Sequence, residues 1–70
     1  MIEVFKTNVE QVDQAKALIE ILYSVFPDSD INFDLEDCDK ILRVKSPRAT
    51  STRILSELKK QGFTCEELQD

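Results

Sequence analysis

The stretch Ile31-Asn32-Phe33-Asp34-Leu35-Glu36-Asp37-Cys38-Asp39-Lys40-Ile41-Leu42-Arg43-Val44-Lys45 decides the fold. Apolar and polar residues alternate through its first half. Because successive side chains of a strand point to opposite faces, this alternation predicts a half-buried strand. Its core face carries Ile31, Phe33 and Leu35, and its solvent face carries Asn32, Asp34 and Glu36.

The second half of the stretch repeats the alternation, with Leu42 and Val44 facing the core and Arg43 and Lys45 facing solvent. The acidic residues between the halves are typical of a turn, so the whole stretch is predicted to form a β-hairpin. A loop of two residues, Cys38 and Asp39, is the expected connection. This loop would pair Leu35 with Leu42, Phe33 with Val44, Asp34 with Arg43 and Asn32 with Lys45.

A strand and a helix are expected before the hairpin. Residues 2–6 form a short strand with Ile2 and Val4 as its inward residues. Thr7 followed by Glu10 matches a helix-capping pair, and Asn8 with Gln11 would serve equally one residue later. An apolar stripe at helical spacing follows, and Pro27 ends it. The predicted buried residues of this helix are Val12, Ala15, Leu18, Ile19, Leu22 and Phe26.

A second helix and a last strand are expected after the hairpin. Thr50 or Ser51 caps the helix, and Ile54, Leu55 and Leu58 are its buried residues. Gly62 stands where a left-handed C-cap is needed, with Phe63 beyond it to fold back on the last turn. Residues 63–68 form a weak strand at a sheet edge.

This order of strand, helix, strand, strand, helix and strand predicts an α+β, ferredoxin-like βαββαβ sandwich over residues 1–70 as one domain. Right-handed crossovers give a four-stranded antiparallel sheet in the spatial order 4-1-3-2, with two helices on one face.

Composition restricts the classes of function. A formal net charge of −5 repels phosphate backbones and anionic lipids, so neither nucleic acid nor membrane is an expected partner. The start of the chain lacks a secretory pattern, and two cysteines are few for a disulfide-held secreted domain, so we expect reduced thiols and a cytoplasmic location. Histidine is absent, and no nucleophile stands beside a base, so we expect no enzymatic activity.

The element order, a threonine-containing loop after the first strand, the long apolar helix and the terminal Lys60-Gln61-Gly62-Phe63 together resemble the heavy-metal-associated domain of copper chaperones and metal-pumping ATPases. The resemblance covers nearly the whole chain. In that family the first loop carries Met-Thr-Cys-x-x-Cys, whose thiolates bind soft ions. The matching residues here are Lys6-Thr7-Asn8-Val9-Glu10-Gln11, in which the amides Asn8 and Gln11 stand at both cysteine positions. Amide oxygens are hard, neutral ligands, so the resemblance implies the scaffold without its metal site.

Other side chains of the chain carry atoms that could bind a metal. Cys38 and Cys65 fall on strands at opposite edges of the predicted sheet, roughly 10–15 Å apart, which is too far for a disulfide or a shared ion. Cys38 lies between two aspartates that disfavour a thiolate, and Cys65 has the parity of a core residue. Residues 28–32 resemble the start of a calcium loop, but Phe33 and Asp39 stand where glycine and glutamate are required. We therefore expect no metal and no cofactor.

The leading hypothesis is a non-catalytic, degenerate relative of the heavy-metal-associated domain that acts as a protein-interaction or accessory module. The predicted interaction edge comprises Ile31, Asn32, Phe33, Asp34, Leu35 and Glu36. Since this strand is expected at a sheet edge, it could pair with a second copy, as a weak homodimer, or with a basic partner. The alternative hypothesis is a metal-ion binding or transport protein that uses Cys38 and acidic residues.

Overall fold

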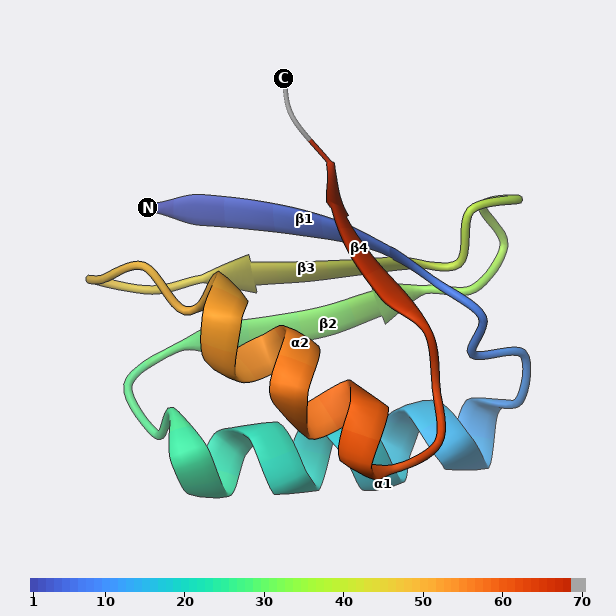
Figure 1. Ribbon diagram of the computed structural model, residues 1–70, viewed down its shortest axis with the longest axis horizontal. Helices are drawn as coiled ribbons and strands as arrows, with labels where there is room; N and C mark the ends of the chain where they lie inside the picture. The colour runs from blue at the N-terminus through green and yellow to red at the C-terminus, as the bar shows by residue number, and fades with distance from the viewer. Residues whose placement is uncertain (69–70) are drawn as a thin grey trace.

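The computed structural model describes residues 1–68 as an antiparallel sheet covered on one face by two helices. The elements are β1 (Ile2–Thr7), α1 (Val12–Val25), β2 (Asp30–Asp34), β3 (Ile41–Lys45), α2 (Ser51–Lys60) and β4 (Cys65–Leu68). The sheet order is β2-β3-β1-β4, which is the predicted order 4-1-3-2. The ferredoxin-like α+β prediction is therefore confirmed (Figure 1).

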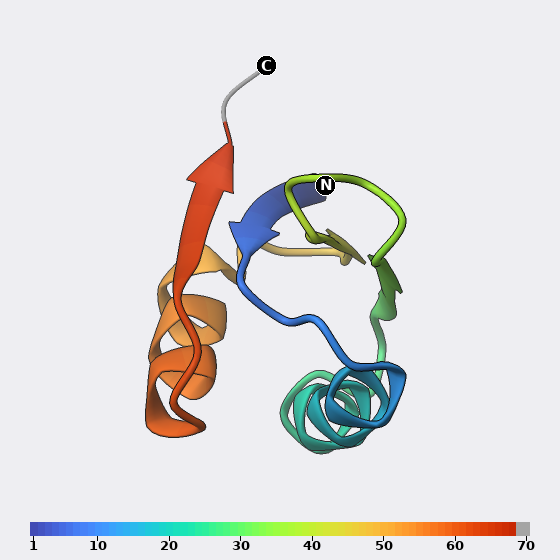
Figure 2. The same ribbon diagram turned by 90° about the vertical axis from the view of Figure 1, so that its right-hand side faces the viewer.

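The core lies between the sheet and the helices. α1 runs beneath the β2 side of the sheet and α2 runs beneath the β4 side (Figure 2). The buried cluster has members in both helices, in the strands β1, β2 and β3, and in the segments on either side of α1. Its members are Phe5, Val9, Ala15, Leu18, Leu22, Phe26, Ile31, Leu42, Val44, Ile54 and Leu58.

The hairpin has the predicted faces and a longer loop than predicted. Phe33 pairs with Leu42, where the sequence predicted Val44, and the connection spans residues 35–40. The prediction of a loop at Cys38 and Asp39 was therefore wrong, and β3 is displaced by two residues. An even displacement keeps every side chain on its own face, so Asp34 and Arg43 are exposed as expected.

The predicted faces of β1 were wrong. Glu3, Phe5 and Thr7 point to the helices and are buried, whereas Ile2 is 61% exposed on the open face of the sheet. The strand alternates as expected, but its phase is shifted by one residue. The reason is a polar contact of Glu3 that local hydrophobicity does not reveal.

Glu3 caps the second helix from a distant strand. One carboxylate oxygen accepts hydrogen bonds from the backbone N and the hydroxyl of Thr50, at 2.8 and 2.7 Å. The other accepts from the backbone N of Ser51, at 3.2 Å. Burial raises the pKa of the Glu3 carboxyl, but the hydrogen bonds from Thr50 and Ser51 outweigh burial and hold this pKa below its ordinary value. Thr50 is the N-cap residue of α2 as predicted, but its hydroxyl donates a hydrogen bond to Glu3 and does not cap the helix itself.

The first helix begins later than predicted. Its N-cap is Gln11, whose backbone N donates to the Gln14 side-chain oxygen at 3.3 Å, so the prediction that Thr7 and Glu10 cap this helix was wrong. Val12 at the helix start is 62% exposed, whereas it was predicted to be buried. The other predicted positions of the stripe are buried or half-buried.

The predicted end of α2 is confirmed. Gly62 has a φ of +87°, which is the left-handed region that favours glycine. The backbone N of Gly62 donates to Lys59 O, and that of Phe63 donates to Leu58 O, both at 3.0 Å. These two bonds form a Schellman motif, and Phe63 packs against the core as expected.

Replacing Glu3 by glutamine should reduce the free energy of unfolding at pH 7 by about 0.5–2 kcal/mol, the usual range for a lost helix cap. The carboxylate's lowered pKa makes its contribution pH-dependent. The contribution is complete above the usual glutamate pKa of about 4.3 and is lost as pH falls through the lower folded-state pKa. Denaturant unfolding of wild type and Glu3→Gln between about pH 7 and pH 3 should show the difference shrinking in acid. Glu66→Gln, which removes an exposed carboxylate on β4, is the control.

A Glu3→Gln difference that stays constant throughout this pH range would contradict the carboxylate cap.

Candidate functional site

The loop between β1 and α1, which contains Asn8 and Gln11, is held by structural contacts. The Asn8 side-chain oxygen accepts a hydrogen bond from the backbone N of Thr64 at 2.9 Å, which joins the loop to the segment before β4. Gln11 is the N-cap residue of α1. Asn8 thus fixes the loop to the segment before β4, and Gln11 begins the first helix.

Thr7 connects this loop to the hairpin. Its hydroxyl donates to Lys40 O at 2.6 Å and accepts from the backbone N of Val9 at 3.3 Å. The backbone N of Thr7 donates to Asp39 O at 3.1 Å. The residue expected to cap α1 therefore fixes the β2–β3 loop, which bends over the open face of the sheet (Figure 2).

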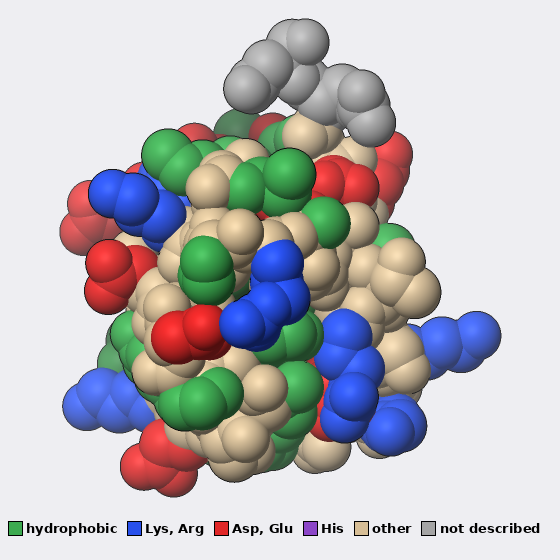
Figure 3. Space-filling view, turned by 90° about the vertical axis from the view of Figure 1, so that its left-hand side faces the viewer, with side chains coloured by type: hydrophobic (Ala, Val, Ile, Leu, Met, Phe, Trp, Pro, Cys, Tyr) green, Lys and Arg blue, Asp and Glu red, His purple; other side chains and the backbone are tan. Residues whose placement is uncertain are grey.

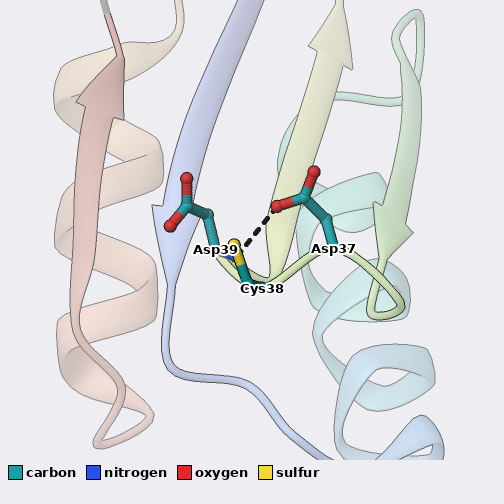
Figure 4. A group of neighbouring side chains, drawn as sticks. All are labelled: Asp37, Cys38 and Asp39. Carbon is teal, nitrogen blue, oxygen red and sulfur yellow. Dashed lines mark hydrogen bonds between the residues drawn. The ribbon is translucent and has the colours of Figure 1, made fainter.

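The tip of that loop gathers the only group of potential metal ligands found among residues 1–68. One ligand atom from each of Asp37, Cys38 and Asp39 lies within 4.8 Å of the others (Figure 4). The Asp37 carboxylate accepts a hydrogen bond from the backbone N of Asp39 at 2.8 Å, and Lys6 Nζ lies 3.7 Å from Asp39 Oδ1. These contacts account for both carboxylates without an ion.

Cys65 lies away from this tip, on β4, and is half-buried against the core. Burial, with a smaller contribution from the nearby Glu67 charge, raises the pKa of the Cys65 thiol to about 12. The side chain therefore remains a neutral thiol at physiological pH and acts as a small apolar residue, as predicted.

The predicted interaction edge is at the edge of the sheet. β2 is the outermost strand next to β3, with no strand on its other side within residues 1–68. Met1 and Ser46 exchange both backbone hydrogen bonds across β1 and β3. In antiparallel strands the N–H and C=O of one residue point to the same side, and successive residues alternate between the two sides. Since the backbone groups of Ser46 point toward β1, those of Arg43, three residues earlier, point toward β2.

The backbone of β2 therefore alternates between inward and outward groups. Asn32 pairs with Arg43, and its N–H and C=O point toward β3. The N–H and C=O of Ile31 and Phe33 therefore point to the opposite, unpaired side of β2. The backbone N of Ile31 donates to the hydroxyl of Tyr23 on α1, at 3.1 Å, which agrees with this phase. Tyr23 thus occupies one outward donor, while the Phe33 N–H and C=O face the space beside the strand.

A groove of about 590 Å³ lies along this edge, between β2 and α1. Its α1 wall includes Val12, Ala15 and Ile19, and its β2 wall includes Phe33 and Leu35. Charged side chains stand around this apolar floor, namely Lys16, Asp34, Glu36 and Arg43. The edge accordingly combines free backbone groups, an apolar floor and a charged rim, which are the parts needed to bind an extended peptide.

A second groove, of about 540 Å³, lies at the opposite end of the molecule, where Pro27 to Asp30 meet Lys45 to Pro47. Ser29 in this region has a buried hydroxyl with no hydrogen-bond partner among the described residues. Arg48 and Asp28 form an ion pair of 2.9 Å here. Figure 3 shows this end with acidic and basic side chains interspersed.

Comparison with known proteins gives no family: no protein-family model matches the chain, and no curated protein sequence matches it. None of the helices in the described part of the chain has the length and apolarity needed to cross a membrane.

Thr7→Val should lower the free energy of unfolding by about 1–3 kcal/mol, because it leaves Lys40 O and the Val9 N–H without their buried partner while keeping the side-chain shape. Denaturant unfolding measures this loss, and amide exchange should quicken in residues 35–40. Thr52→Val, on the exposed side of α2, makes the same chemical change and should alter stability by less than about 0.5 kcal/mol. Equal effects of the two substitutions would contradict the assigned role of Thr7.

Proposed function

We propose that this chain is a non-catalytic protein-interaction module that binds an extended segment of another polypeptide along β2. The observation that carries the proposal is the groove of about 590 Å³ beside an unpaired edge strand. An added strand would hydrogen-bond to the outward backbone groups at Phe33, and its alternate side chains would lie on the groove floor.

Two further observations support a binding role over catalysis. The chain has no histidine, and the thiol of Cys65 is held neutral by burial. The scaffold resembles the heavy-metal-associated domain, but its first loop is committed to contacts with Thr64 and Gln14. An accessory role through protein contact fits these features, and we place this role in the cytoplasm, as the sequence predicts.

The proposal is tested by selecting random eight-residue peptides on the immobilised protein by display. Peptides recovered on the wild type should lose at least about tenfold in affinity for Val12→Glu, which places a charge on the groove wall. Ile2→Glu is the matched control, since Ile2 and Val12 are 61% and 62% exposed, but Ile2 lies on the open face. Its affinity for the same peptides should be unchanged.

Failure to select any peptide would contradict the proposal. Peptides whose affinity is unchanged by Val12→Glu, or is lost in Ile2→Glu, would place binding on another surface.

A second candidate function is metal-ion binding at the hairpin tip. The observation that favours it is the convergence of Asp37, Cys38 and Asp39 within 4.8 Å. A thiolate with two carboxylates is a mixed donor set that would suit a borderline ion such as Zn(II) better than Cu(I) or Ca(II).

Calorimetric titration of the reduced protein with Zn(II), Cu(I) and Ca(II) separates the two candidates. The leading proposal expects no binding tighter than micromolar. Sub-micromolar binding that is lost in Cys38→Ser and retained in Cys65→Ala would establish the second candidate in its place.

A further inference from the structure

The side chains of β2 specify the chemistry of a strand added at its edge, provided that the proposed docking along β2 is correct. Residues of the incoming strand opposite Ile31 and Phe33 would face the apolar groove, because paired residues share a face of the sheet. Residues opposite Asp30, Asn32 and Asp34 would lie on the open face. The incoming strand therefore meets apolar and polar positions in strict alternation.

The open-face positions carry acidic side chains without an ion-pair partner. Asp34 stands across from Ile41 in β3, whereas Asp30 stands across from Lys45. Arg43 lies diagonally from Asp34 on the rim of the groove and forms no ion pair with it. Glu36 follows Asp34, and its backbone N donates to the Asp34 carboxylate at 3.2 Å. Among residues 1–68 the ion pairs of this region involve Asp28 and Asp39, which leaves Asp34 and Glu36 free to meet a cation.

Pairing with a second copy of β2 brings like charges together. In one antiparallel arrangement, Asn32 of one copy lies opposite Asn32 of the other. Ile31 of each copy then lies opposite Phe33 of the other, which is favourable, but Asp30 of each copy lies opposite Asp34 of the other. Centring the pair on Phe33 sets Asp30 against Glu36 twice. Like charges directly opposite each other on a sheet destabilise the pairing. The acidity that attracts a basic strand therefore opposes a homodimer through this edge.

We propose that the partner of this edge is an extended segment of another protein in which basic side chains alternate with aliphatic ones, the basic ones facing Asp34 and Glu36. Lys16 on the α1 wall repels a second cation inside the groove. The basic side chains of the incoming strand are therefore favoured on the open face only. Tyr23 limits the length of the pairing, since its hydroxyl already holds the Ile31 N–H.

Two capped heptapeptides test the proposal by NMR titration of the isotope-labelled protein. In one, arginine alternates with valine, and in the other glutamate replaces each arginine. The arginine peptide should bind at least about tenfold more tightly at low salt, with shifts in Val12 and Phe33, and the ratio should fall as salt screens the charges. Asp34→Asn should weaken the arginine peptide about threefold, whereas Glu66→Gln, on the opposite edge strand, should not.

Each contrary result has a distinct meaning. Equal affinity of the two peptides would overturn the basic partner while leaving docking at the edge intact. Binding by neither peptide at Val12 and Phe33 would count against the proposed function itself. Shifts along β2 on concentrating the protein alone would make a second copy the occupant and overturn the inference.

Discussion

The Glu3 carboxylate, held against the first backbone N–H groups of α2, lies on the same face of β1 as the core residue Phe5. β1 is an interior strand of the sheet, between β3 and β4. With Glu3 directed toward the helices, the pleat directs Phe5 and Thr7 the same way. Phe5 then reaches the centre of the core, and Thr7 reaches Lys40 in the hairpin loop. Glu3, Phe5 and Thr7 thus join one face of β1 to the second helix, the core and the hairpin loop.

Hydrophobic alternation predicted the hairpin faces and missed the face of β1 for an identifiable reason. In β2 the apolar residues Ile31 and Phe33 share one parity, and in β3 Leu42 and Val44 share one parity against the single exception Ile41. In β1 the apolar residues Ile2, Val4 and Phe5 occupy both parities, and the choice depends on where Glu3 finds its donors. Those donors belong to Thr50 and Ser51, which no local pattern links to residue 3. The loop length was missed because turn composition fixes the place of a reversal less closely than its existence.

The edge position of β2 followed from strand order, whereas the features that make the edge a site depend on packing. The groove exists because α1 lies beside β2, with Val12, Ala15 and Ile19 facing the strand. Val12 belongs to the apolar stripe that indicated a buried residue, but the sheet does not extend far enough to cover it. The contact between Tyr23 and Ile31 joins a helix to a strand across a turn, and nothing in the sequence signals a tyrosine that covers a strand donor. These contacts leave Phe33 as the outward-facing residue that β2 offers to a partner.

The central claim is that β2 presents free backbone groups at Phe33 beside a groove. Residue-specific amide hydrogen exchange of the free protein tests it most directly. The account predicts slow exchange at Asn32, whose N–H faces β3, and fast exchange at Phe33, whose N–H faces outward. Ile31 should be slowed by the Tyr23 hydroxyl and should become fast in Tyr23→Phe. Protection of Phe33 equal to that of Asn32 in the dilute protein would contradict the account, because the edge would then already be covered.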